Sequence, residues 1–194
     1  ELTGVLEMLV RRHGNRGIVL GAPEVPLSAR LDFLRAAKKH GCYTVCSVLA
    51  EEAPEFLKTN GASACDLLSV NADEAEALGG VTCESVLRGQ NPEIQLILTL
   101  GKEGFDVLEK GGCRHFDAIP ASSISTAGAG DALLGGIIAG LASGLPLQTA
   151  EGASAASLGA ICASFAVESP HTIPEGFLLR EVKLRAEKNH ILII

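Results

Sequence analysis

The chain has 194 residues, a formal net charge of −7 and 47% hydrophobic residues. This length and apolar content are enough for one sizeable core without disulfides or a structural metal, so we expect a single domain over residues 1–194. The acidic balance argues against a nucleic-acid-binding protein, which usually needs a strongly basic face.

The six cysteines and five histidines are dispersed along the sequence. They form no C-x-x-C pair, no zinc-finger spacing and no H-E-x-x-H helix, so we assign them no metal chemistry. Reduced, mostly buried thiols are typical of a cytoplasmic protein, which is the location we expect. We expect neither a signal peptide nor a membrane segment, because the apolar stretches 132–147 and 152–167 fall short of the ~20 residues that span a bilayer.

In chain order, the sequence predicts alternating strands and helices. A strand at 17–20 precedes a helix that begins at Ser28, the predicted N-cap, and ends at Gly41. The next predicted elements are a strand at 43–48, a short helix at 54–58, a strand at 67–70, a helix at 71–78 and a strand at 94–100. Such alternation with continuous apolar strands predicts a mostly parallel sheet covered by helices on both faces.

The pattern changes after residue 99. Glycine-rich turns flank the segments 105–108 and 113–116, which predicts an antiparallel hairpin. Helices are then expected at 131–142, at 147–165 with Pro146 at its start, and at 175–188. The expected fold class is α/β, a three-layer α/β/α arrangement around a doubly wound, mostly parallel sheet.

A glycine-rich segment, Ser125-Thr126-Ala127-Gly128-Ala129-Gly130-Asp131, stands directly before an apolar helix. Free backbone N–H groups of Gly128, Ala129 and Gly130 at a helix N-terminus would form an anion site. A carboxylate there, that of Asp131, can take a proton from an attacking hydroxyl while the N–H groups stabilise charge on a transferred phosphoryl group. The alternative is a helix start in which Asp131 only complements the helix dipole.

Two other nucleotide-binding motifs do not fit. A dinucleotide fingerprint needs Gly or Ala where Leu133 stands, and it should follow an early strand of the fold. A Walker P-loop is excluded because Glu103 follows Gly101-Lys102 and no glycine stands at position 96. A Rossmann dehydrogenase that binds NAD is therefore a less favoured alternative.

The segment that ends in Gly128-Ala129-Gly130-Asp131 resembles the D-T-x-G-A-G-D signature of the ribokinase-like (PfkB) carbohydrate kinases. The stretch from Thr99 to Gly104 resembles the family's T-x-G-x-x-G turn, which lies against the nucleotide. The stretch from Asn71 to Glu74 resembles its N-x-x-E motif, which organises magnesium and phosphate. Taken alone, the last two could be a tight turn and a helix cap. Their order and spacing identify the chain as similar to this family from about residue 18 to residue 174.

The resemblance implies an ATP-dependent kinase that phosphorylates a hydroxymethyl group of a sugar or nucleoside, with Mg²⁺ as the metal. It makes Asp131 the general base, assigns the anion hole to Gly128, Ala129 and Gly130, and places Glu74 at the metal, through water. The residues that it assigns to the nucleotide site are Asn71, Thr99, Gly101, Gly104, Gly130 and Ala155. A homodimer is compatible with the resemblance, and ribose, fructose derivatives and nucleosides such as pseudouridine all remain open as substrates.

Three departures from the family pattern matter. Ser125 stands where the signature begins with Asp, which puts potassium activation in doubt, and Cys46-Ser47-Val48 stands where many members have an Asp-x-Asn sequence. Family members also carry a substrate-binding aspartate and a small β lid ahead of the part that resembles Ile18. The resemblance thus covers the C-terminal two-thirds of such a protein, and the sequence leaves open whether the chain is part of a longer protein or a reduced homologue without the lid. A nucleotide-binding pseudoenzyme or non-catalytic fragment is the functional alternative.

Overall fold

The computed structural model describes residues 2–14, 17–171 and 178–193, and the chain divides into two compact units. Unit 1 comprises Glu1–Thr99 and Leu108–Cys113, and unit 2 comprises Leu100–Val107 and Arg114–Ile194. Six strands form one sheet in which β1 to β6 follow one another in chain order. The single domain expected over residues 1–194 stays a prediction.

The strands of unit 1 are parallel, as their continuous apolar sequences predict. They are β1 (Ile18–Gly21), β2 (Tyr43–Ser47), β3 (Leu67–Asn71) and β4 (Gln95–Thr99). The register places Cys46 beside Leu68, and Leu68 beside Leu96. Residues at the alternate positions, such as Val45, Leu67 and Ile97, are also fully buried, as in a strand that is apolar on both faces.

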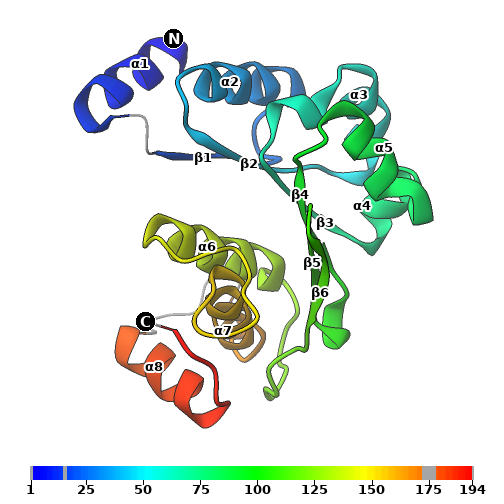
Figure 1. Cartoon of the computed structure of the whole chain (residues 1–194). Coiled ribbons are helices and arrows are strands. Elements are labelled where there is room, and N and C mark those ends of the chain that lie inside the picture. Colours follow the sequence, from blue (N-terminus) through cyan, green and yellow to red (C-terminus); the bar gives the residue numbers. More distant parts are fainter. Residues whose placement is uncertain (1, 15–16, 172–177, 194) are drawn as a thin grey trace. The chain divides into compact units, whose positions relative to one another are not determined.

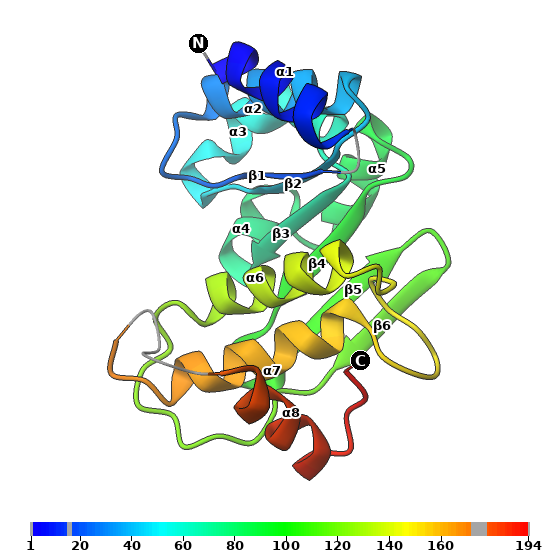
Figure 2. The same cartoon turned by 90° about the vertical axis from the view of Figure 1, so that its left-hand side faces the viewer.

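Helices of unit 1 pack on one face of these strands. They are α1 (Leu2–His13), α2 (Leu27–Lys39), α3 (Ala53–Lys58), α4 (Ala72–Ala77) and α5 (Cys83–Gln90). Leu34 of α2, Phe56 of α3 and Leu78, the C-cap residue of α4, are completely buried in one cluster with the strand residues Cys46 and Leu68. Helix α1 lies beside α2 (Figures 1 and 2), where Leu6 packs against Ala37 and Cys42. The core of unit 1 thus fixes the helices that follow β1, β2 and β3.

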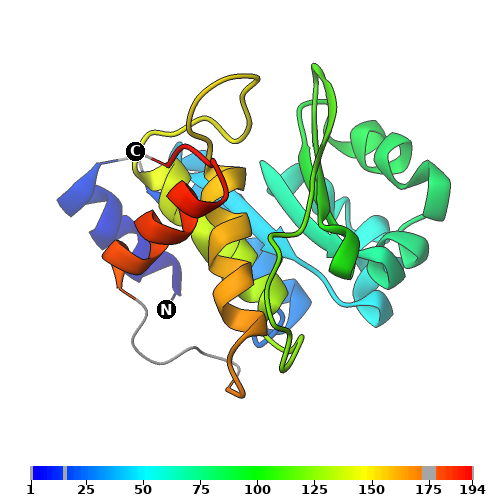
Figure 3. The same cartoon turned by 90° about the horizontal axis from the view of Figure 1, so that it is seen from below.

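Unit 2 is built around a pair of closely packed helices. Its helices are α6 (Ala129–Ala142), α7 (Ala155–Val167) and α8 (Leu179–Lys188), and in Figure 3 α6 lies along α7 with α8 against α7. A Cβ added to Gly140 would lie 2.7 Å from the Cα of Ala155, and one added to Gly159 would lie 2.7 Å from the carbonyl oxygen of Leu133. The glycines therefore allow the two backbones to approach more closely than side chains would permit.

The predicted hairpin is present as β5 (Phe105–Glu109) and β6 (Gly112–Phe116), which are neighbours in the sheet. The rings of Phe105 and Phe116 stack with centroids 5.1 Å apart. The division into units cuts across both strands. None of the helices in the described ranges is long and apolar enough to cross a membrane.

Several predicted helix boundaries were wrong. Helix α2 begins at Leu27 with Pro26 at the N-cap, so Ser28 is not the cap; the fixed φ of proline suits it to a helix start. Helix α7 begins at Ala155 and not at residue 147, because Gly152 has a φ of 95° and the Ser154 hydroxyl caps the helix by accepting from the Ser157 N–H at 3.1 Å.

Other differences concern elements that the sequence pattern did not predict. Helices α1 and α5 were not expected, and the 3-10 turn Ala50–Glu52 (η1) was also missed, whereas the turn predicted at residues 101–104 is present as the 3-10 helix Gly101–Glu103 (η4). The last helix begins at Leu179, and residues 175–177 of the predicted helix lie outside the described residues. Short amphipathic segments such as α5 carry a weak periodic signal, which explains why they were overlooked.

The packing of α6 on α7 makes a testable prediction about two glycines on one helix. Gly140→Ala should lower the free energy of unfolding by about 1–3 kcal/mol, because the added methyl group would overlap the backbone of α7. Gly135→Ala should instead raise it by up to about 1 kcal/mol, since an added Cβ has nothing within 4 Å and alanine favours a helix. Urea unfolding of both variants measures the two changes, and equal effects would contradict the packing argument.

Candidate active site

The carboxyl ends of β3 and β4 bring two of the predicted site residues together. Asn71 is the last residue of β3, Thr99 is the last residue of β4, and the parallel register pairs them directly. In α/β sheets, ligands bind outside the carboxyl ends of the strands. The N-x-x-E and T-x-G-x-x-G segments therefore begin side by side at the edge of the sheet where a ligand is expected.

Asn71 and Glu74 form a reciprocal cap at the start of α4. The Oδ1 of Asn71 accepts from the Glu74 N–H at 2.9 Å, and the Oε2 of Glu74 accepts from the Asn71 N–H at 2.7 Å. This is the capping box that the residue spacing also allowed. Glu74 thus has a structural function, and its role at a metal stays a prediction that depends on the remaining carboxylate oxygen.

The electrostatic surroundings of Glu74 favour a cation. Its side chain is half-buried, and this desolvation is the main reason that its pKa is raised. The hydrogen bond from the Asn71 N–H lowers the pKa, whereas the nearby carboxylates of Asp73 and Glu51 raise it further. A carboxylate among like charges and away from water is stabilised by a positive ion.

A buried arginine, which the sequence did not reveal, supports the end of β2. Arg30 of α2 is 1% exposed, and its guanidinium donates to the Ser47 carbonyl oxygen at 3.0 Å and to Glu52 Oε2 at 2.5 Å. The same oxygen of Glu52 accepts from the Leu49 N–H at 3.0 Å, which closes η1. Arg30 and Glu52 thus provide polar contacts at the end of β2, where Cys46-Ser47-Val48 departs from the family pattern.

In unit 2, the turn that follows Thr99 requires both of its glycines. Gly101 has a φ of 61° and Gly104 a φ of 98°, and a Cβ on Gly104 would lie 2.0 Å from the carbonyl oxygen of Phe116. The Leu100 N–H donates to the Gly104 carbonyl oxygen at 2.8 Å and closes the turn. No side chain could be accommodated at position 104, so this glycine is required by the fold whatever it contacts.

The N-terminus of α6 has the geometry of an anion site. Gly128 takes the left-handed conformation, with a φ of 79°, and α6 begins at the next residue. Within the described part of the chain, the N–H groups of Gly128 and Gly130 donate no hydrogen bond, and nothing lies within 4 Å of the position a Cβ on Gly130 would take. Asp131 is exposed in the first turn of the same helix. An anion could therefore approach the backbone beside this carboxylate.

Two details of this segment differ from the expectation. The Ala129 N–H is not free, because it donates to the Thr126 carbonyl oxygen at 3.3 Å. Of the three N–H groups predicted for the anion site, those of Gly128 and Gly130 therefore remain. The Ser125 hydroxyl accepts from the Ala127 N–H at 3.2 Å, so this side chain shapes the turn before the glycines.

Ala155, which the resemblance assigned to the nucleotide site, lies in the contact between α6 and α7. The residue is completely buried, and its Cα and Cβ lie against Gly140 of α6. Ala155 itself therefore packs the helix pair, and a nucleotide contact near it on α7 stays a prediction.

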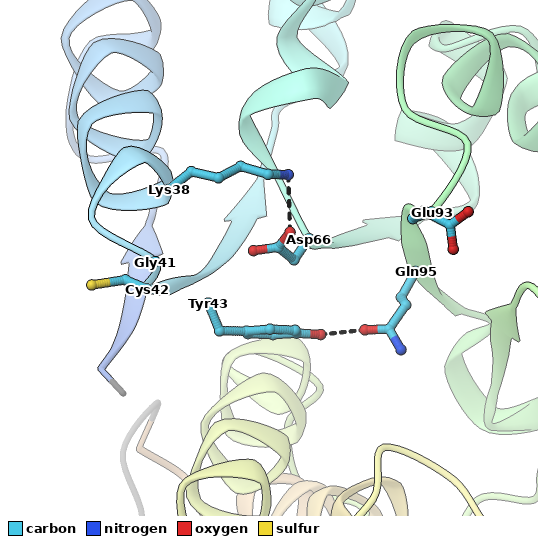
Figure 4. Close-up of a pocket in the computed structure, with 7 residues that line it drawn as sticks. All are labelled: Lys38, Gly41, Cys42, Tyr43, Asp66, Glu93 and Gln95. Carbon is cyan, nitrogen blue, oxygen red and sulfur yellow. Dashed lines mark hydrogen bonds and ion pairs between the residues drawn. The ribbon is translucent and has the colours of Figure 1, made fainter. Parts of the chain in front are cut away.

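A separate cavity lies at the opposite, amino-terminal edge of the unit 1 strands. It has a volume of about 420 Å³, and Figure 4 shows its lining, which includes Lys38, Tyr43, Asp66 and Gln95. Lys38 Nζ pairs with Asp66 Oδ1 at 2.9 Å, and the Tyr43 hydroxyl donates to Gln95. None of the predicted site residues lines this cavity. Its polar groups bind one another, so we do not assign it to the reaction.

The residues present fit Mg²⁺ only as a partner of bound phosphate. No group of three or more His, Cys, Asp or Glu side chains with metal-site geometry occurs in the described ranges. Mg²⁺ usually keeps several water molecules and binds one or two carboxylates together with substrate phosphates. Glu74 beside Asp73 and Glu51 provides that limited carboxylate set.

The sequence matches the pfkB family carbohydrate kinases over residues 14–175. The chain belongs to this family. The match contains all three motifs that carried the resemblance.

Curated relatives include kinases of several sugars. The chain is 29% identical to ribokinase from Staphylococcus aureus (strain COL) over 135 residues, which cover 66% of this chain and 43% of that protein. It is 33% identical to the uncharacterized sugar kinase YegV of Escherichia coli (strain K12) over 145 residues, covering 71% and 43% of the two chains. The chain thus spans less than half the length of these relatives.

Solved structures confirm the ribokinase-like fold. Aminoimidazole riboside kinase from Salmonella enterica, complexed with aminoimidazole riboside and an ATP analog, superposes with a TM-score of 0.72 at 22% identity. The match covers 88% of this chain and 63% of that chain. Arabidopsis thaliana ribokinase complexed with ribose and ATP also gives a TM-score of 0.72 at 22% identity, covering 94% and 58%.

The cap at α4 makes the two roles of Glu74 separable. Glu74→Gln keeps an oxygen that accepts from the Asn71 N–H, so thermal stability should change little, whereas the magnesium requirement of the kinase should rise. Glu74→Ala removes the cap as well and should cost about 1 kcal/mol of stability in addition. Thermal unfolding and magnesium titrations of both variants provide the measurement; a magnesium requirement unchanged in Glu74→Gln would leave Glu74 only as a cap.

Proposed function

We propose that this chain forms the nucleotide-binding and phosphoryl-transfer part of an ATP-dependent kinase that acts on a hydroxymethyl group of a sugar or nucleoside. The observation that carries the proposal is the start of α6. An exposed carboxylate, that of Asp131, follows two N–H groups, those of Gly128 and Gly130, that donate no hydrogen bond to any described residue. Membership of a carbohydrate kinase family supports the reaction class.

Asp131 is the proposed general base. Its carboxylate takes the proton of the substrate hydroxyl as that oxygen attacks the terminal phosphorus. The N–H groups of Gly128 and Gly130 donate to the transferred phosphoryl group and stabilise the charge that develops on its oxygens. The positive end of the α6 dipole adds to the same effect.

The proposed nucleotide and metal contacts come from the edge of β3 and β4. Asn71 and Thr99, which are paired in the sheet, face the phosphate side, and the Gly101–Gly104 turn contacts the nucleotide. Glu74 would hold Mg²⁺ through water, and the metal would neutralise charge on the phosphates when bound. The conformation of the turn is already fixed by the Leu100 to Gly104 hydrogen bond, which limits its ordering cost on binding.

We propose the class of substrate from the names of the relatives. Their names include a ribokinase, a fructokinase and a riboside kinase, and ribose, fructose and ribosides all carry a primary hydroxyl group. A screen of ribose, fructose and nucleosides with labelled ATP tests the proposed acceptors.

A non-catalytic nucleotide-binding protein is the second candidate, and Ser125, which departs from the family signature, favours it. Calorimetry with Mg–ATP and a phosphorylation screen distinguish the two, because binding without product would identify the non-catalytic protein. A dehydrogenase is disfavoured by the family match. It is also disfavoured by Leu133, a buried residue of α6 that stands where a dinucleotide fingerprint needs Gly or Ala.

The role of Asp131 predicts a large loss of turnover in Asp131→Asn. Removal of a general base typically costs about 10²–10⁴ in rate. ATP affinity should stay within a few-fold of the parent, because the amide is isosteric and the N–H groups remain. Steady-state kinetics and calorimetry on the complete enzyme measure both quantities.

Glu55→Gln is a matched control, because Glu55 is also a carboxylate in the first turn of a helix, α3. If Asp131 only complemented the helix dipole, both variants would lose a few tenths of a kcal/mol of stability and neither would lose turnover. Turnover of Asp131→Asn within a few-fold of the parent would contradict the assignment.

A weak response to potassium is the second prediction about this site. Ser125 offers a neutral hydroxyl, which already accepts from the Ala127 N–H, where the family signature has a carboxylate. Without that charge, little compensates the ion for its lost hydration. Adding potassium should change the rate less than about threefold, which is roughly 0.65 kcal/mol of barrier.

Ser125→Asp is the variant that checks the cause. A carboxylate at this position should increase the potassium response above that of the parent, since it restores the missing charge. Strong activation of the parent at millimolar potassium would show that backbone carbonyl groups alone are sufficient.

A further inference from the structure

The segment that leads into the glycine-rich loop has no regular structure of its own. Residues 117–128 connect β6 to α6 without a helix or strand. Ordering each such residue costs about 1–2 kcal/mol of conformational entropy, so a defined loop needs contacts that hold it. The position of the α6 N-terminus, with Gly128 and Asp131, depends on these contacts.

This segment is attached to the end of α7. The N–H groups of Ile124 and Ser125 both donate to the carbonyl oxygen of Val167, at 2.7 and 3.2 Å, and the Ser122 N–H donates to Glu168 Oε1 at 3.3 Å. Val167 is the last residue of α7, and the last carbonyl groups of a helix have no partner within it. The loop is therefore held through the C-terminus of α7.

Arg185 of α8 fixes the carboxylate in this attachment. Its Nη2 binds the second oxygen of Glu168, Oε2, at 2.5 Å, and its Nη1 donates to the Ser164 hydroxyl at 3.0 Å. Its guanidinium carbon lies 3.7 Å from the centre of the Phe165 ring. Three different contacts hold one planar guanidinium, an arrangement that lysine could not reproduce.

The charge state of Glu168 agrees with this arrangement. The hydrogen bond from Arg185 is the main reason that the pKa of Glu168 is lowered, with a smaller contribution from the Ser122 N–H. The carboxylate is thus ionised at neutral pH and accepts from both partners at once. One oxygen faces α8 and the other faces the loop.

We propose that Arg185 is a positioning residue for the anion site, acting through Glu168 and the segment Ser122–Ser125 on Gly128 and Asp131. Only three residues lie between Ser125 and Ala129, where α6 with Asp131 begins. A displacement of the segment is therefore transmitted to the N–H groups and to the carboxylate. The catalytic consequence rests on the proposed function, whereas the physical link does not.

The link is tested by hydrogen exchange on Arg185→Ala, with Arg88→Ala as the control. Arg88 also binds a glutamate, Glu84, at 2.7 Å, but it lies on α5. We expect the amides of Ile124 and Ser125 to exchange at least about tenfold faster in Arg185→Ala, a local loss of about 1.4 kcal/mol. The same amides should be unchanged in Arg88→Ala. Unchanged exchange in a folded Arg185→Ala would overturn the proposal.

Kinetics of the complete enzyme test the consequence. Arg185→Ala should lower kcat by about tenfold, with the KM for ATP within about twofold, because the turn after Thr99 is untouched. Millimolar guanidinium should restore part of the lost kcat in this variant and none in Arg88→Ala. An equal loss in both variants, or no rescue, would reduce Arg185 to a stabilising residue.

A second variant keeps the test decisive if Arg185→Ala does not fold. Arg185→Lys keeps a positive charge near Glu168 but loses the two guanidinium hydrogen bonds and the contact with the Phe165 ring. We therefore expect the amides of Ile124 and Ser125 to exchange at a rate between those of the parent and of Arg185→Ala. Exchange equal to the parent in this variant would count against a role for the guanidinium geometry. Faster loop exchange in a protein that phosphorylates nothing would uphold the link and overturn the proposed function instead.

Discussion

The parallel pairing of β1 to β4 is the constraint on which unit 1 depends. Parallel strands need a crossover connection after each strand. These connections place the helices that follow β1, β2 and β3 on the sheet and make every strand begin at one edge and end at the opposite edge. The carboxyl ends Ser47, Asn71 and Thr99 therefore collect at one edge. A slip of β4 by one residue would separate Thr99 from Asn71 and turn its buried side chains to the opposite face.

Close contact between α6 and α7 has the corresponding function in unit 2. Gly136, Gly140 and Gly159 allow backbone atoms to meet where side chains normally intervene, so α6 is held along its length. Its first turn, which carries Asp131, is in turn fixed by the loop attached to the end of α7. A rigid helix with an ordered N-terminus is suited to hold donors at a set position, and such preorganisation makes electrostatic stabilisation effective.

Two glutamates use their carboxylate oxygens for separate contacts. Glu74 caps α4 with one oxygen, and its other oxygen is the one proposed to act at a cation, whereas the two oxygens of Glu168 join α8 to the loop. Arg30 differs, because its guanidinium is almost fully buried and its Nε has no hydrogen-bond partner among the described residues. Removing one member of such a buried ion pair strongly destabilises the fold, because the other charge is left buried without a partner. The end of β2 therefore depends on both Arg30 and Glu52.

The sequence by itself determined the parallel α/β class, the order of the main strands and the glycine segment before Asp131. These depend on local signals: apolar runs of strand length, turn residues, and glycines at positions where φ is positive. It could not determine where α7 begins, because Pro146 is typical of a helix start, whereas Gly152 adopts a φ of 95° and the helix begins only after it. The Arg30–Glu52 and Arg185–Glu168 pairs were also hidden, because their members are 22 and 17 residues apart and ordinary charged side chains carry no sign of their partners. Only the tertiary structure, by folding distant segments against one another, decided that Ala155 is buried and that Ser122–Ser125 is attached to α7.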